Sequence, residues 1–225
     1  MELKDKVIVI TGALGALGRG VAEAAAAAGA TVVAVDRVDG QPPRGAQAWP
    51  ALDLGDAQAT LIALAAIAAR HGRIDALVNI AGGFRWETLA DGSPDTWDQL
   101  YQINVRTAVN ACRGALPHLG AGGRIVNIGA AGAVKAAAGM GAYAASKAGV
   151  ARLTEALAEE LKDREITVNA VLPSIIDTPA NRADMPSADH SRWVRPQELA
   201  EVILFLLSGR ASAVTGALIP VTGRV

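Results

Sequence analysis

The first 36 residues alternate in a way that few folds accommodate. KVIVIT at 6–11 is a short, continuous apolar run, typical of a strand buried on both faces of a parallel sheet. The glycine-rich stretch TGALGALGRG follows, then an alanine-rich segment that we expect to be a helix ending at Gly29. TVVAVD at 31–36 reads as the next strand. This order of strand, glycine turn, helix and strand predicts a dinucleotide-binding unit.

The glycine turn supplies the first candidates for cofactor binding. Glycines let the backbone turn tightly and approach a pyrophosphate, and the following helix start offers free N–H groups to the anion. The candidates in this turn are Gly12, Leu14, Gly15, Ala16, Leu17 and Gly18.

The end of the second predicted strand carries an acid that bears on cofactor choice. Asp36 lies 18 residues after Gly18, where a carboxylate can accept from the ribose hydroxyls of a dinucleotide. The same charge repels a 2′-phosphate, so we expect NAD rather than NADP. Arg37 weakens this preference, because a guanidinium at that position can bind such a phosphate.

Strand and helix patterns alternate along the rest of the chain. Segments 39–50 and 174–193 are polar and irregular, and we expect them to be loops. This alternation predicts one α/β domain over 1–225, with a parallel sheet covered by helices on both faces. Further strands are expected at 73–83, 123–130, 166–173 and 216–223, and helices at 57–70, from Pro94 onward, at 143–162 and at 196–209.

Composition excludes several classes of function. The formal net charge is −1 and no basic run is present, so neither nucleic acid nor an anionic membrane is expected as a partner. The single cysteine, Cys112, excludes an intrachain disulfide and fits a reducing cytoplasm. No signal-peptide pattern or long apolar run is present, which also favours a cytoplasmic protein. His71, His118 and His190 are scattered, and no metal site is expected.

Tyr143 and Lys147 form the clearest catalytic pattern. Four residues apart on a helix, their side chains share one face. A lysine cation beside a phenol favours the phenolate, so we expect the pKa of Tyr143 to fall from about 10 toward neutrality. Such a tyrosine can donate or accept a proton. The stretch 127–147 contains no serine or threonine before Tyr143 that could help hold a substrate oxygen.

Two further polar residues have both a functional and an ordinary interpretation. Asp53 can accept from an adenine amino group, or it can cap the helix that follows. Asn104 lies inside the helix that we expect to begin after the N-cap Ser93 and the first-turn Pro94. A mid-helix asparagine is a mediocre helix former, so it is either buried for a reason or simply exposed.

Eight motifs occur together in one order. They are TGALGALG, Asp36, Asp53, NIAG at 79–82, INV around Asn104, IVNI at 125–128, YAASK at 143–147 and PSIIDT at 173–178. Over essentially its full length the chain resembles the short-chain dehydrogenase/reductase family. The resemblance implies a Rossmann-type, doubly wound parallel sheet of about seven strands and hydride transfer between a nicotinamide and a small-molecule substrate. It also implies a homodimer or homotetramer, with the helices near 94–117 and 143–162 as contact faces.

The resemblance also implies roles for individual residues. Tyr143 would be the general acid/base, Lys147 would tune it and hold the nicotinamide ribose, and Asn104 would help hold a water that relays protons to Lys147. Thr178 would contact the nicotinamide carboxamide, with Pro173 and Ile176 lining that pocket. The other implied cofactor contacts are Asp53, Leu54, Asn79, Ala81 and Gly82.

The chain departs from the family pattern at three places. The middle glycine of the turn is Ala16, and the usual Pro-Gly after the sixth strand is Pro173-Ser174. The family's catalytic serine lies thirteen residues before the tyrosine, and that position is Ala130. Losing such an electrostatic donor typically costs about 10²–10³ in turnover.

With alanine at position 130, three hypotheses for the function of the chain stay open. The first is reduction or oxidation of a small carbonyl or alcohol. The second is reduction of quinonoid dihydropterin, a reactive conjugated electrophile, because the loop 177–193 and GMGAY before the lysine helix are similar to those of dihydropteridine reductases. The third is an NAD-binding sensor or structural protein that has lost efficient catalysis. Retention of Tyr143, Lys147 and Asn104 favours catalysis.

Overall fold

All the strands of the sheet run parallel, as the continuous apolar runs predict. The computed structural model describes residues 3–225 and contains one seven-stranded sheet with the order β3-β2-β1-β4-β5-β6-β7. The strands are β1 (Val7–Thr11), β2 (Thr31–Val35), β3 (Ala46–Ala48), β4 (Ile74–Asn79), β5 (Leu119–Ile128), β6 (Thr167–Pro173) and β7 (Leu218–Val221). The predicted α/β fold class and doubly wound topology are confirmed.

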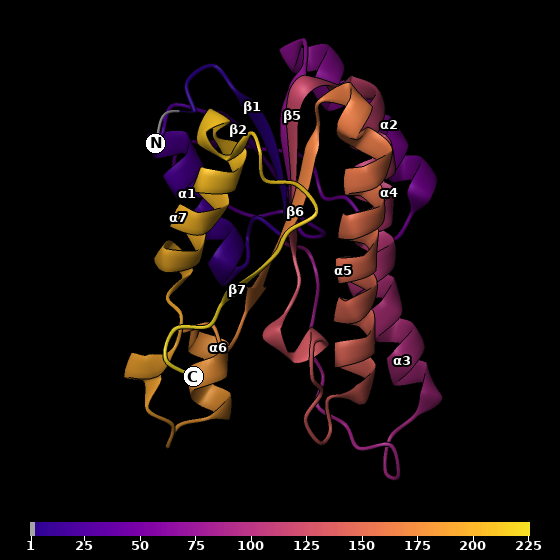
Figure 1. The fold of residues 1–225 in the computed structure, drawn as a ribbon, viewed down its shortest axis with the longest axis vertical. Helices are drawn as coiled ribbons and strands as arrows, with labels where there is room; N and C mark the ends of the chain where they lie inside the picture. The colour runs from indigo at the N-terminus through magenta and orange to yellow at the C-terminus, as the bar shows by residue number, and fades with distance from the viewer. Residues whose placement is uncertain (1–2) are drawn as a thin grey trace.

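Helices cover both faces of this sheet, also as predicted. Helices α1 and α7 lie on one side, and α2, α4 and α5 lie on the other (Figure 1). No helix among residues 3–225 is long and apolar enough to cross a bilayer. The α-helices are α1 (Ala16–Ala27), α2 (Ala57–His71), α3 (Pro94–Tyr101), α4 (Thr107–Ala115), α5 (Gly141–Leu161), α6 (Pro179–Asp184) and α7 (Pro196–Leu207). Short 3₁₀ turns occur at Leu116–His118, Ala131–Ala133, Lys162–Arg164, His190–Arg192 and Gly209–Ala211.

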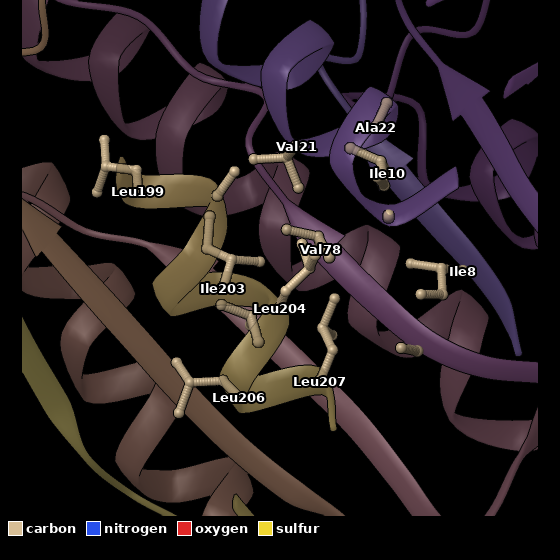
Figure 2. Close-up of a cluster of buried hydrophobic side chains, with 14 of the residues drawn as sticks. Ile8, Ile10, Val21, Ala22, Val78, Leu199, Ile203, Leu204, Leu206 and Leu207 are labelled. Atoms are coloured by element: carbon tan, nitrogen blue, oxygen red, sulfur yellow. The ribbon is translucent and has the colours of Figure 1, made fainter. Parts of the chain in front are cut away.

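The core on the α1 and α7 side depends on the apolar face of α7. Leu199, Ile203 and Leu204 are almost fully buried and pack toward Val21 of α1 and Ile10 of β1 (Figure 2). Burying one such side chain contributes about 1.5–3 kcal/mol. This packing fixes α1, and with it the glycine turn from which α1 starts.

The predicted helix starts are largely confirmed, with one change. Ser93 caps α3 by accepting from the Asp95 backbone N–H at 3.1 Å, and Pro94 is the first helical residue. Asp56 caps α2 by accepting from the Ala59 N–H at 2.9 Å. The alternative role of Asp53 as the cap of this helix is therefore wrong.

Both predicted loops contain regular structure that the sequence did not reveal. Segment 39–50 includes β3, whose Ala46 pairs with Val32 of β2 and extends the sheet. Segment 174–193 includes α6, which begins because Thr178 accepts from the Asn181 N–H and Pro179 occupies the first turn. The strands expected at 73–83 and 123–130 also have different limits. β4 ends at Asn79, after which the Ile80 and Ala81 N–H groups donate to the Thr11 hydroxyl, and β5 runs from Leu119 to Ile128.

Truncating the centre of the α7 face tests this account of the core. We expect Ile203→Ala to lower the free energy of unfolding by about 2–5 kcal/mol, because it leaves a cavity against α1. Glu201→Ala, on the exposed side of the same helix, should change it by less than about 0.5 kcal/mol. Urea unfolding followed by circular dichroism measures both, and equal effects would contradict the assignment of the buried face.

Candidate active site

The glycine turn and the end of β4 are packed directly against each other. Gly12 has a φ of +65°, and a methyl group there would lie 2.7 Å from the Ala81 nitrogen. A side chain on Gly18 would clash with the Gly12 carbonyl. The Thr11 hydroxyl accepts from the N–H groups of Ile80 and Ala81 at 3.1 and 3.2 Å. The structure thus brings the predicted residues 12–18 and 79–82 together at the carboxyl ends of the strands, where open α/β sheets bind ligands.

The start of α1 has the form expected of an anion site. Gly15 is the N-cap residue, and no side chain accepts from the first N–H groups of the helix. Ala16 is exposed, so its extra methyl group points into open space and the turn tolerates this departure. Leu17 is buried and secures the first turn of α1 in the core. The residues present therefore fit a pyrophosphate.

Asp36 is held at the edge of this turn. One carboxylate oxygen accepts from the Leu14 N–H at 2.9 Å, and the other accepts from the Arg37 N–H at 2.8 Å. The Arg37 side chain is exposed beside it. These contacts fix a negative charge next to the glycine turn.

Asp53 and Leu54 follow β3 in the chain and differ in burial and in their hydrogen bonds. Asp53 is exposed and accepts from the Gly55 N–H at 2.8 Å, so its carboxylate borders the surface. Leu54 is buried, and its carbonyl accepts from Asn110 Nδ2 at 2.8 Å. The Asn110 amide thus holds the backbone of this predicted cofactor segment in place.

Tyr143 and Lys147 lie near the start of α5, one turn apart. Lys147 is buried, and its Nζ donates to the Ile128 carbonyl at 2.8 Å, at the end of β5. Burial raises the pKa of the Tyr143 phenol to about 12 and lowers the pKa of the Lys147 ammonium to about 8. The predicted lowering of the tyrosine pKa is therefore not found, because desolvation dominates and Lys147 points to a carbonyl oxygen.

Asn104 is buried, which excludes the exposed interpretation of this residue. It sits in a π-helical turn, η1 (Gln102–Arg106), between α3 and α4. Such turns insert one extra residue and often occur at functional sites. Its Oδ1 accepts from the Gly83 N–H at 2.9 Å, and its Nδ2 donates to the Gly83 carbonyl and to Ser146 Oγ, both at 3.0 Å.

Ser146 is a site residue that the sequence reasoning missed. Its hydroxyl accepts from Asn104 and donates to the Tyr143 carbonyl at 2.7 Å. A methyl group placed on Gly82 would lie 2.5 Å from Asn104 Oδ1 and 3.5 Å from Lys147 Nζ. The end of β4, the π turn and α5 therefore meet at one point. The only signal in the sequence was a serine immediately before Lys147.

Asn79 has a different place from the other predicted cofactor contacts. Its side chain is buried in the sheet, where Nδ2 donates to Asn127 Oδ1 at 2.8 Å. Asn127 in turn donates to Thr154 Oγ1 at 2.9 Å. The Asn79 amide thus joins β4 to β5 and α5, and its side chain does not reach the group formed by Asn104, Ser146 and Tyr143.

The remaining predicted residues lie on the segment that leaves β6. Pro173 ends this strand, and Ile176 is half-buried, with its carbonyl accepting from Asn181 Nδ2 at 2.8 Å. Thr178 caps α6 through its hydroxyl, which accepts from the Asn181 N–H at 3.2 Å. Asn181 thus fixes the shape of the segment that carries both predicted residues.

The position where the family resemblance places a catalytic serine is occupied by Ala130, which has only a methyl group. Ala130 is 5% exposed and follows β5. A hollow of about 330 Å³ opens near the start of α5, between the loop 87–92, the start of α3 and Ala142. Within residues 3–225, no three His, Cys, Asp or Glu side chains are grouped so that they could hold a metal ion.

Comparison with known proteins identifies relatives over the full chain. Residues 6–188 match the sequence profile of the short chain dehydrogenases. The 3-oxoacyl-[acyl-carrier-protein] reductase FabG of Thermotoga maritima is 33% identical over 244 residues, covering 99% of this chain and 98% of the relative. The meso-2,3-butanediol dehydrogenase of Serratia marcescens is also 33% identical, covering 99% and 95%. The structure of a short chain dehydrogenase from Burkholderia cenocepacia in complex with NADP superimposes with a TM-score of 0.90 at 32% identity, covering 99% and 98%.

The buried ammonium of Lys147 should make stability depend on pH. The pKa is about 8 in the folded protein against 10.5 for an ordinary lysine, so the unfolded chain binds more protons between these values. The free-energy cost of burying the Lys147 ammonium is present in full below pH 8, and it disappears as the pH rises toward 10.5. Relative to Lys147→Met, the native protein should gain about 3 kcal/mol of stability across this range.

Urea unfolding of the native protein and Lys147→Met between pH 7 and 11 measures this difference. Lys162→Met is the control, because Lys162 is exposed and pairs only with Glu159. Native and Lys147→Met profiles that stay parallel over the whole range would contradict a buried, desolvated ammonium.

Proposed function

The chain belongs to the short chain dehydrogenase family, and on that premise we propose that it is an NAD-dependent oxidoreductase acting on a small carbonyl or alcohol substrate. One observation carries the proposal. Asn104, Ser146 and Tyr143 form one hydrogen-bonded series, and the Lys147 ammonium lies next to the same glycine segment as Asn104. This series fixes the backbone that carries the Tyr143 phenol, and general acid catalysis depends on such a positioned proton donor.

The chain's own residues fit a nicotinamide dinucleotide. The glycine turn and the uncapped start of α1 would hold the pyrophosphate, and Asp36 would accept from the adenosine ribose hydroxyls. Lys147 would contact the nicotinamide ribose, and Thr178 would meet the carboxamide. When bound, this group supplies or accepts the hydride.

Asp36 supports NAD over NADP. Its carboxylate is fixed by two backbone N–H groups, so its negative charge cannot easily turn away from a 2′-phosphate. The neighbouring Arg37 and the NADP bound to the Burkholderia cenocepacia relative favour the phosphorylated cofactor. We give the fixed charge more weight, because the Arg37 side chain is exposed, whereas the Asp36 carboxylate is held by two backbone N–H groups.

Tyr143 is proposed as the proton donor. With a pKa of about 12, the phenol is protonated at neutral pH and can give its proton to a substrate oxygen. The Lys147 ammonium, with a pKa of about 8, still carries its charge at pH 7 and stabilises the phenolate left behind. This protonation state favours reduction of a carbonyl. We propose Asn104 and Ser146 as positioning residues, since they hold the backbone of Tyr143.

A second candidate function follows from Ala130. Its buried methyl group cannot donate to a substrate carbonyl, so a substrate that needs little polarisation suits this site. Quinonoid dihydropterin, the substrate of dihydropteridine reductases, has this property because its conjugated ring accepts a hydride readily. A chain that binds NAD without turning over either kind of substrate would instead be a sensor or structural protein.

Removing the phenol hydroxyl tests the proposed role of Tyr143. We expect Tyr143→Phe to lower the rate of NADH oxidation with a reducible substrate by at least about 10²-fold, since general acid catalysis contributes that much. The dissociation constant for NADH, measured by fluorescence titration, should stay within about twofold.

Tyr101→Phe is the matched control, because Tyr101 is the only other tyrosine in the chain and is exposed on α3. It should leave both quantities unchanged. Equal loss of turnover and of NADH binding in Tyr143→Phe would contradict an acid role.

Replacing Asp36 tests the cofactor proposal. We expect Asp36→Ala to shift the ratio of kcat/KM for NADH over NADPH toward NADPH by at least about tenfold, equal to about 1.4 kcal/mol. Asp39→Ala removes a nearby acid that caps only the Ala51 N–H, and it should leave the ratio unchanged. An unaltered ratio in Asp36→Ala would rule out the ribose contact.

A further inference from the structure

Two large aromatic side chains are exposed on the segment that follows β4. The chain has only two Phe, four Trp and two Tyr residues, yet Phe84 and Trp86 lie two residues apart and are 56% and 58% exposed. Apolar side chains of this size usually enter the core, and exposed groups of them often mark a binding site.

Phe84 borders the proposed proton donor. The centroids of its ring and the Tyr143 ring are 4.9 Å apart, and the two planes are inclined by 83°. This edge-to-face geometry is the favoured one for aromatic pairs. The segment begins at Gly83, whose N–H and carbonyl both form hydrogen bonds with the Asn104 side chain. Asn104 therefore fixes the backbone immediately before Phe84.

Trp86 is held in place by the loop that precedes α5. Its indole Nε1 donates to the Ala138 carbonyl at 3.0 Å, and a side chain at Gly139 would clash with the indole ring. The Glu87 N–H also donates to the Gly139 carbonyl at 2.8 Å. Hydrogen bonds therefore join segment 84–87 to the loop before α5. They hold the Trp86 indole in one position although more than half of the residue is exposed to solvent.

Polar groups near Tyr143 do not replace the missing hydroxyl. Ala130 presents a buried methyl group, and the Ser146 hydroxyl is already engaged by Asn104 and by the Tyr143 carbonyl. A substrate bound here would contact aromatic side chains and the Tyr143 phenol. The methyl group of Ala130 cannot donate a hydrogen bond to the substrate carbonyl. The carbonyl must then be polarised by the substrate itself.

We propose that Phe84 and Trp86 form the specificity wall for a flat aromatic ring, and that the substrate is an aromatic ketone activated by a second carbonyl in conjugation with it. This proposal rests on the proposed reductase function. An aromatic ring gains attraction from both side chains, and the neighbouring carbonyl withdraws the electrons that a serine hydroxyl would otherwise draw. In the reduction the C=O π bond opens, the carbon takes the hydride given up by the reduced nicotinamide, and the oxygen takes the Tyr143 proton.

Two cyclic 1,2-dicarbonyl compounds that differ in aromaticity test the proposal. Isatin and cyclohexane-1,2-dione both carry an activated carbonyl, but only isatin is a flat aromatic. With NADH, the native protein should show at least about tenfold higher kcat/KM for isatin, as two aromatic contacts would give. Phe84→Leu and Trp86→Leu should each lower kcat/KM for isatin about 3- to 10-fold, chiefly through KM, and leave cyclohexane-1,2-dione within about twofold.

Ile62→Ala is the control, because Ile62 is an apolar side chain that is 61% exposed on α2, outside the segments that form the site, and it should leave the preference unchanged. Turnover of both compounds without preference, or an equal loss for both in Trp86→Leu, would overturn the aromatic contact alone. Turnover of neither compound, with NADH or with NADPH, would overturn the proposed reductase function instead. The Trp86 variant is decisive because Trp86, unlike Phe84, makes no ring contact with Tyr143.

Discussion

The site depends on the burial of one amide. Asn104 is 1% exposed, and a buried amide is tolerated only when its polar atoms are bonded. Its partners are both backbone groups of Gly83 and the hydroxyl of Ser146, so it joins the end of β4 to α5. Tyr143 is attached to this group through Ser146, and Phe84 follows Gly83 directly. The π turn Gln102–Arg106 is the local distortion that accommodates Asn104 between these elements.

Desolvation sets the proton chemistry of the same site. The fold places Tyr143 and Lys147 where burial disfavours the charged form of each, which raises the pKa of the phenol and lowers that of the ammonium. In the proposed reduction, the protonated Tyr143 phenol gives up its proton, and the Lys147 ammonium one helical turn away would compensate the charge of the phenolate. The negative charge that would develop on the substrate oxygen would drive this proposed transfer.

Periodicity and motif order were sufficient to predict the sheet, the helices on its two faces and the positions of Gly12, Asp36, Tyr143 and Lys147. The signals there are local: a continuous apolar run, a glycine turn and a four-residue helical spacing. Three features depended on contacts distant in sequence and could not be predicted. These are the pairing of Ala46 with β2, the inward direction of the Asn79 amide, and the direction of the Lys147 ammonium toward Ile128. The pKa of Tyr143 was misjudged for the same reason, since burial is a property of the whole fold.

We propose that the site combines a proton donor, Tyr143, with a buried methyl group at Ala130 where a polarising hydroxyl would be expected, so that its substrates must carry their own activating group. The most direct measurement is the kcat/KM of Ala130→Ser and of the native protein with acetophenone and with isatin. We expect Ala130→Ser to raise kcat/KM about 10²–10³-fold for acetophenone, the effect of one restored electrostatic donor, and much less for isatin. Equal gains for the two ketones, or no gain for acetophenone, would contradict it.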